Sequence, residues 1–183
     1  IDLSIRIIKE LHHNMPVKLL IFGSGNEEVK LKDYVNKKNA SSFVSFMGEF
    51  SDITKLYASF DALISFSSIE GLPTVILESI QNKKPVFYTD CTSGPRELMA
   101  PHTNPLAKTK AYEKTNCGYL VKPVFETATY RNSLTEYEKE YVQILESFIE
   151  DVQSKTFSMQ FDTKPFSEDI IIEQWLKVIK EIQ

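Results

Sequence analysis

The sequence has 183 residues, 42% hydrophobic and 25% charged, and its 21 Lys and Arg against 25 Asp and Glu give a formal net charge of −4. This composition is typical of one globular domain, and its acidic balance argues against nucleic acid as a partner. Its apolar runs fall short of the roughly 18 residues that a membrane span needs. Its two cysteines, Cys91 and Cys117, match neither a disulfide framework nor a zinc site.

Helices and short apolar strands alternate in the first part of the chain. Ile5, Ile8 and Leu11 share one face of the first helix, off which Ile7 falls, and Pro16 ends that helix because proline disfavours helical geometry in the residue before it. The predicted elements are a helix over Ile1–His13, a strand over Val17–Phe22, a helix over Glu27–Lys38, a strand over Phe43–Phe46 that closes at Gly48, and a helix capped by Asp52 that runs through Ala58.

The alternation continues through the middle of the chain. The predicted elements here are a strand over Asp61–Phe66, a loop over Ser67–Leu72, a helix over Pro73–Gln81 with proline in its first position, a strand over Pro85–Tyr88, a loop over Thr89–Gly94 and a helix begun by Pro95. Strands that are apolar on both faces and alternate with helices predict an α/β, Rossmann-like parallel sheet with helices on both faces.

Beyond Pro101 the pattern weakens. Residues 102–117 are polar and are predicted to form an irregular insertion, followed by a last strand over Gly118–Val121. A capping box from Ser133 to Glu136 opens a long helix with an apolar stripe. Ser167 caps a final helix, and its apolar side chains are expected to pack against the sheet; they are Ile172, Trp175, Leu176, Ile179 and Ile182.

Ligands of open parallel sheets bind beyond the carboxyl ends of the strands. Three loops therefore matter, over Gly23–Asn26, Ser67–Leu72 and Asp90–Gly94, and each precedes a helix whose free amide groups can bind phosphate. The first resembles a dinucleotide fingerprint only in part, because Glu28 stands where the third glycine belongs. A simple tight turn explains that loop equally well.

The second loop contains the most informative pattern, a pair of acidic residues. Glu70 lies in the loop and Glu78 lies in the following helix among apolar residues, where a carboxylate is costly to bury without hydrogen-bond donors. Thr74 and Glu78 share a helix face at i, i+4 spacing. Two acids flanking free helix amides suit a ligand with a central phosphate and hydroxyl groups at both ends, such as a nucleotide sugar. Alternatively, Glu78 is a surface acid on an amphipathic helix.

The sequence Ser67-Ser68-Ile69-Glu70-Gly71-Leu72-Pro73-Thr74-Val75-Ile76-Leu77-Glu78 resembles the signature of retaining family-4 glycosyltransferases of the GT-B fold. Further blocks resemble the same family in the same order; they are Leu20–Gly25, Val44–Gly48, Lys84–Val86, Ser93–Glu97, Gly118–Val121 and Phe166-Ser167 with Trp175. Over nearly its whole length the chain is similar to the C-terminal, donor-binding domain of that family.

The resemblance implies a role for each matching residue. Glu78 would bind the ribose hydroxyl groups of a UDP-, GDP- or ADP-sugar, and Glu70 would hydrogen-bond the transferred sugar near the reacting carbon. The backbone of Gly71, Leu72, Pro73 and Thr74 would hold the sugar and the diphosphate, Phe46, Met47 and Gly48 would lie near the base, and Gly23, Ser24 and Gly25 would border the cleft. The resemblance implies no cofactor and no metal, with fixed positive groups and helix amides stabilising the leaving diphosphate.

The resemblance also indicates what this sequence lacks. The family supplies an Arg and a Lys for the diphosphate from a segment that would precede Ile1, and an N-terminal domain for the acceptor. We therefore expect residues 1–183 to form a single domain cut from a larger enzyme that acts on a polysaccharide or glycolipid acceptor. We expect the full enzyme to be cytoplasmic, with a peripheral location at the inner face of the membrane. The chain alone is expected to bind donor weakly and to transfer no sugar.

Other interpretations remain open at this point. The chain could be a non-catalytic nucleotide-sugar-binding module, while a Rossmann-type oxidoreductase or methyltransferase is disfavoured by the incomplete glycine loop. Arg96, in the first turn of its helix, could contact a phosphate or form a structural ion pair, and the same choice holds for Asp90.

Overall fold

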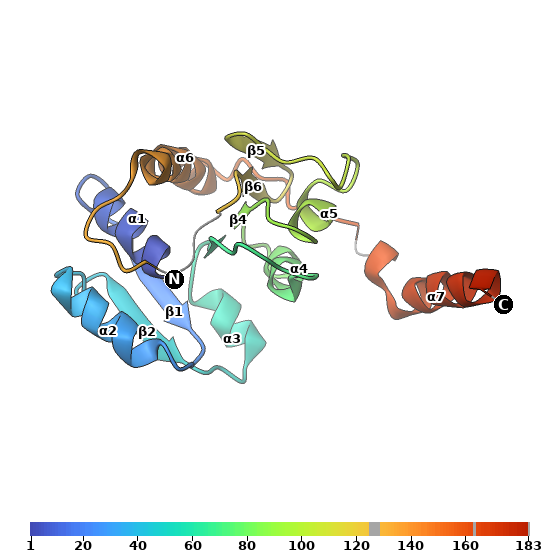
Figure 1. Cartoon of the computed structure of the whole chain (residues 1–183), viewed down its shortest axis with the longest axis horizontal. Helices are drawn as coiled ribbons and strands as arrows, with labels where there is room; N and C mark the ends of the chain where they lie inside the picture. The colour runs from blue at the N-terminus through green and yellow to red at the C-terminus, as the bar shows by residue number, and fades with distance from the viewer. Residues whose placement is uncertain (125–128, 163, 183) are drawn as a thin grey trace.

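The computed structural model describes residues 1–124, 129–162 and 164–182, and it has the predicted α/β architecture (Figure 1). In chain order the elements are α1 (Asp2–His12), β1 (Leu19–Phe22), α2 (Glu28–Lys37), β2 (Val44–Gly48), α3 (Ile53–Ala58), β3 (Leu63–Ser65), α4 (Thr74–Gln81), β4 (Val86–Thr89), α5 (Pro95–Met99), β5 (Tyr112–Thr115), β6 (Gly118–Val121), α6 (Glu136–Gln153), a 3₁₀ turn (Lys164–Phe166) and α7 (Glu168–Ile182).

The strands form two sheets. β1 pairs in parallel with β2, and the second sheet has the order β3-β4-β6-β5, in which β5 runs antiparallel to β6 and the other neighbours are parallel. Every residue of β4 and β6 is buried, as predicted for strands covered on both faces. β1 and β3 are largely half-buried, so these two strands are covered less completely than predicted. β5, which was not predicted as a strand, alternates between exposed and half-buried residues.

The close approach of β4 and β6 depends on a glycine. Gly118 has a φ of +149°, and a Cβ atom added there would lie 1.8 Å from the carbonyl oxygen of Val86. Only a residue without a side chain permits this backbone contact. Gly118 is therefore the residue that lets β6 cover the edge of β4.

The main apolar core joins the helices to both sheets. Phe87 of β4, Tyr119 of β6 and Phe148 of α6 pack with ring centroids 5.4–5.5 Å apart. Tyr141, Leu145 and Phe148 of the predicted α6 stripe are buried together with Ile144. α1 is buried on more than the predicted face, because Ile7 is as inaccessible as Ile5. A second, smaller core cluster forms around Ile76, Ile80, Val86, Tyr88, Leu98 and Leu120.

A buried ion-pair cluster fixes α1 against α6. The guanidinium of Arg6 donates to Asp2 at 2.8 Å and to Glu138 at 2.6 Å, and these side chains are only 4–8% exposed. Burial acts to raise the pKa of Asp2, but hydrogen bonds from Arg6 and from the backbone amides of Thr129 and Tyr130 outweigh it and leave that pKa below its ordinary value. The cluster joins segments 127 residues or more apart in the sequence.

Three local predictions are wrong in detail. Pro73 is the N-cap of α4 and not its first helical residue. The capping box of α6 is formed by Thr135 and Glu138, two residues later than predicted, because Glu138 is the acid that reaches back to the Thr135 amide. Residues 102–117 are not irregular throughout, since 112–115 form β5 by antiparallel pairing with β6.

The prediction that the α7 stripe packs against the sheet is also wrong. α7 has no buried residue, and Trp175, Leu176 and Ile182 are 64%, 52% and 80% exposed. Figure 1 shows α7 extending away from the sheets, with the 3₁₀ turn beside its start. Within the described residues, no helix is long and apolar enough to cross a membrane.

The α7 geometry predicts the effect of removing one large aromatic side chain. Trp175→Ala should change the free energy of unfolding by no more than about 0.5 kcal/mol, because the residue is 64% exposed. Phe148→Ala, at a fully buried position of α6, should cost about 3–5 kcal/mol. Urea unfolding of both variants checks this, and a large loss from Trp175→Ala would contradict the exposed position of α7.

The Arg6 cluster predicts a large stability loss from a single truncation. Arg6→Ala should lower the free energy of unfolding by about 3–5 kcal/mol, because it leaves two buried carboxylates without their cation. The matched control is Lys32→Ala, which breaks the exposed Lys32–Glu28 pair on α2 and should cost less than about 1 kcal/mol. Equal losses in the free energy of urea unfolding would show that the buried cluster contributes no more to stability than an exposed ion pair.

Candidate functional site

The loop that holds Glu70 is attached to the neighbouring loop by its backbone. The Glu70 amide donates to the Thr92 carbonyl at 3.1 Å, the Ser93 amide donates to the Glu70 carbonyl at 3.0 Å, and Ile69 forms a parallel bridge with Thr92. The loops after β3 and β4 are thus joined at the carboxyl ends of their strands, where the sequence predicted the site. Both the amide and the carbonyl group of Glu70 are therefore hydrogen-bonded, as they would be in a paired strand.

Gly94 allows the two loops to touch. It has a φ of +90°, and a Cβ atom added there would lie 2.1 Å from the carbonyl oxygen of Gly71 and 2.8 Å from Cδ of Pro73. Gly71 and Leu72 are exposed and Pro73 is buried. Pro73 leads directly into α4, so the contact at Gly94 also sets the position of the first turn of that helix.

Among the described residues, the Glu70 side chain has one hydrogen-bond donor, a tyrosine hydroxyl group. Tyr88 of β4 is 2% exposed, and its hydroxyl group donates to Oε1 of Glu70 at 2.8 Å. Burial, with a contribution from the bond to Glu70, raises the pKa of Tyr88 to about 12. The hydroxyl group therefore stays protonated at neutral pH and remains a donor to the carboxylate.

Glu78 is held in the same way by a different tyrosine. Tyr57 of α3 is 3% exposed, and its hydroxyl donates to Oε2 of Glu78 at 3.0 Å. Burial, reinforced by the bond to Glu78, raises the pKa of Tyr57 above its ordinary value. Glu78 is half-buried in α4, so it is neither fully buried nor a fully exposed surface acid.

The first turn of α4 lies between the two carboxylates in the sequence. Thr74 begins the helix and is exposed, so the first amide groups of α4 lack intrahelical partners by helix geometry. The Pro73 N-cap supplies no side-chain hydrogen bond to them. These amides can accept an anionic ligand, which the positive end of the helix dipole also favours.

The other predicted site residues lie together at the end of the β1–β2 pair. The Gly23 amide donates to the Gly48 carbonyl at 2.7 Å, and Ser24 Oγ donates to Glu49 at 2.5 Å. The turn residues Gly23, Ser24 and Gly25 are exposed, Met47 is 38% exposed, and Phe46 and Gly48 are half-buried.

Aromatic contacts connect these residues to Glu78. The ring of Phe22, which precedes Gly23, lies 6.0 Å from that of Phe60, and Phe60 lies 5.2 Å from Tyr57, the donor to Glu78. The predicted residues thus form two groups, one around Gly23 and Gly48 and one around Glu70 and Glu78, joined through these rings.

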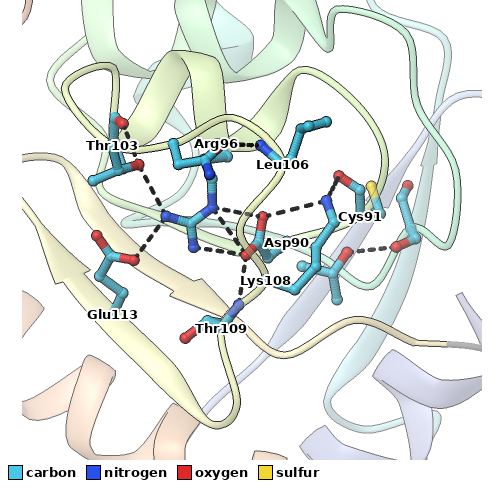
Figure 2. Close-up of polar contacts among 12 residues, drawn as sticks. Asp90, Cys91, Arg96, Thr103, Leu106, Lys108, Thr109 and Glu113 are labelled. Atoms are coloured by element: carbon cyan, nitrogen blue, oxygen red, sulfur yellow. Dashed lines mark hydrogen bonds and ion pairs between the residues drawn. The ribbon is translucent and has the colours of Figure 1, made fainter.

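Asp90 and Arg96 form a structural ion pair (Figure 2). Arg96 Nη2 donates to Asp90 at 2.7 Å, and the side chains are 4% and 0% exposed. The amide of Thr109 also donates to Asp90 at 2.7 Å, while Arg96 Nη1 donates to Thr103 and Glu113 at 3.0 Å. Of the two sequence interpretations, the ion pair is the one observed. It ties the loop after β4 to α5, β5 and the segment between them.

Comparisons with known proteins decide the family. A model of the family described as "Glycosyl transferases group 1" matches residues 1–150. The chain belongs to this family. An uncharacterized glycosyltransferase of Methanocaldococcus jannaschii is 30% identical over 183 residues, an alignment that covers 96% of this chain and 45% of that protein. The chain therefore spans less than half the length of this relative.

Solved structures of glycosyltransferases share the fold. Staphylococcus aureus TarM, in a complex that includes UDP, superposes with a TM-score of 0.69 at 20% identity over 96% of this chain and 32% of the TarM chain. The pneumococcal O-GlcNAc transferase GtfA, in complex with UDP and GlcNAc, superposes with a TM-score of 0.64 at 18% identity over 99% of this chain and 33% of the other. The α/β fold of this group 1 chain is that of GT-B glycosyltransferase domains.

Sequence reasoning missed the two tyrosines of this candidate site. Tyr57 and Tyr88 occupy helix and strand positions where an aromatic residue is ordinary core, and each contacts a glutamate 18 or 21 residues away. The available signal was that both carboxylates needed donors. In the described part of the chain, no group of three or more His, Cys, Asp or Glu side chains is arranged to hold a metal ion.

The contact at Gly94 predicts that one added methyl group will disrupt this site. Gly94→Ala should lower the free energy of unfolding by more than about 1–2 kcal/mol, since alanine disfavours the positive φ and its Cβ meets backbone. Gly25→Ala is the matched control, because a Cβ there meets nothing within 4 Å, and it should change stability by less than about 0.5 kcal/mol. Urea unfolding compares the two, and equal stabilities would refute the close packing of the loops.

Proposed function

We propose that this chain is the donor-binding domain of a retaining glycosyltransferase that uses a nucleoside diphosphate sugar, with UDP as the nucleotide. The observation that carries the proposal is the pair of carboxylates, Glu70 and Glu78, each held by a buried tyrosine hydroxyl. They flank a helix N-terminus whose first amides are available to an anion. A nucleotide sugar has hydroxyl groups on both sides of its diphosphate and matches that arrangement.

In this proposal each group has one task. Glu78 accepts hydrogen bonds from the ribose hydroxyl groups, and Glu70 accepts them from the transferred sugar. The backbone of residues 71–74 holds the sugar and the diphosphate. Its N–H donors, at Gly71, Leu72 and Thr74, stabilise the charge that develops when the diphosphate leaves. Phe46, Met47 and Gly48 border the base, and the turn Gly23–Gly25 borders the cleft. No metal and no cofactor take part.

The choice of UDP draws on the two solved glycosyltransferases of the same fold. TarM and pneumococcal GtfA each have UDP in their complexes. We extend the proposal to a hexose or N-acetylhexosamine as the transferred sugar and to a polysaccharide or glycolipid as the acceptor, which the rest of a longer enzyme would bind. Cationic side chains for the diphosphate would also come from that part.

A ligand screen tests the proposal. UDP-, GDP- and ADP-sugars are added to the 183-residue chain, and thermal unfolding is followed. A UDP-sugar should raise the Tm by about 2–4 °C for each kcal/mol by which bound ligand stabilises the folded state at the concentration used. Glu78→Ala should abolish that rise because the ribose loses its acceptor.

The matched control is Glu173→Ala on the exposed helix α7, which should leave the rise intact. A rise with GDP- or ADP-sugars alone would overturn the choice of UDP. A rise that survives Glu78→Ala would overturn the site.

A further inference from the structure

The donor to Glu70 is fixed by the central strand of its sheet. Tyr88 lies in β4, which is paired on both sides, with Ser65 of β3 opposite on one edge and Leu120 of β6 opposite on the other. Its hydroxyl group therefore occupies a point set by the sheet itself. Glu70, by contrast, lies in a half-buried loop and depends on that point for the direction of its carboxylate.

The hydrogen bonds of Glu70 leave one oxygen for a ligand. Tyr88 occupies Oε1, and Oε2 has no protein hydrogen bond within the residues that the structure describes. The backbone of Glu70 is fixed separately by its two bonds to the Thr92 and Ser93 loop, at 3.1 and 3.0 Å. A bond to Oε1 on a held backbone leaves the carboxylate little freedom to rotate.

We propose that Tyr88 is a positioning residue that turns the second carboxylate oxygen of Glu70 toward the sugar of the donor, while Tyr57 does the same for Glu78 at the nucleoside. This inference rests on the proposed function and deepens it, because it divides the recognition of one ligand between two tyrosine–glutamate pairs. Neither tyrosine touches the reacting atoms. Each acts through its glutamate, and the two pairs act on opposite ends of the donor.

The geometry around Tyr88 supports this role. Ser65 lies opposite Tyr88 in the register of β3 and β4, and its hydroxyl group hydrogen-bonds to that of Ser67 at 3.2 Å. The single proton of the Tyr88 hydroxyl group is donated to Oε1 of Glu70. The hydroxyl group is thus oriented toward Glu70 before any ligand arrives. A phenylalanine at this position would keep the packing of the ring and remove only the hydrogen bond to Glu70.

Two ligands separate the two pairs by experiment. The Kd values of UDP and of UDP-N-acetylglucosamine are measured calorimetrically on the 183-residue chain, and the ratio of the first to the second reports the contribution of the sugar. Tyr88→Phe should lower this ratio about five- to tenfold and leave the Kd of UDP unchanged, because Glu70 is expected to contact only the sugar.

Tyr57→Phe is the matched variant at the other end. It should weaken UDP and UDP-N-acetylglucosamine by the same factor and leave the ratio unchanged. Tyr137→Phe removes a hydroxyl bond to the Pro123 carbonyl outside the site and should alter neither Kd. Thermal unfolding of all three variants shows whether each is folded at the temperature of the titrations.

The outcomes distinguish the inference from the function on which it rests. An unchanged ratio in folded Tyr88→Phe, or an equal loss for both ligands, would overturn the positioning role while the proposed function stands. Failure of the unmodified chain to bind either UDP ligand would overturn the proposed function and the inference with it.

A double substitution tests whether Tyr88 acts through Glu70. Glu70→Ala should lower the ratio by itself, and adding Tyr88→Phe to it should lower the ratio no further. A further drop of the size seen for Tyr88→Phe alone would show that Tyr88 acts independently of Glu70 and would contradict the positioning role.

Discussion

The burial of β4 between β3 and β6 is the constraint on which the site depends. Every residue from Val86 to Thr89 is buried and paired with a neighbouring strand. The last two residues of this strand and the residue that follows it each support the site loops. Tyr88 donates to Glu70, Thr89 donates to the carbonyl of Ser67, and Asp90 forms the buried ion pair with Arg96. A strand that cannot shift thereby fixes a loop that would otherwise be free.

Polar groups in the interior of this chain serve to position backbone and not merely to stabilise it. The Asp90–Arg96 pair and the Arg6 cluster are both almost inaccessible, and each joins segments that are separate in the sequence. Such pairs contribute little net stability because desolvation opposes their attraction, but breaking one is costly. The two tyrosine–glutamate pairs also position polar groups, but they lie closer to the solvent. In the proposed function, a ligand reaches the carboxylate oxygen that each tyrosine leaves free.

The sequence predicted the features that local rules determine. Periodicity and spacing predicted the buried strands β4 and β6 and the loops at the carboxyl ends of the strands. They also placed Glu70 in one of these loops and Glu78 in the helix that follows. The sequence did not predict Tyr57 and Tyr88 as donors, because an aromatic residue in a strand or a helix gives no indication of which distant carboxylate it meets. The α7 stripe was misjudged for a related reason, since an amphipathic pattern shows that a face is apolar and not what covers it. The capping box was predicted at Ser133 and is observed at Thr135. Both Ser133–Glu136 and Thr135–Glu138 have the capping-box spacing, and the ion pair of Glu138 with Arg6 favours the second.

The central claim is that Glu70 and Glu78 bind opposite ends of one nucleotide sugar across the start of α4. A crystal structure of the 183-residue chain with UDP-N-acetylglucosamine tests it most directly. The account predicts the ribose hydroxyl groups within hydrogen-bond distance of Glu78, the diphosphate against the backbone of residues 71–74, and the sugar at the Glu70 oxygen that Tyr88 leaves free. A nucleotide bound elsewhere, for example along the shallow hollow of about 580 Å³ beside Glu173 and Lys177 on α7, or bound with its ribose away from Glu78, would contradict it.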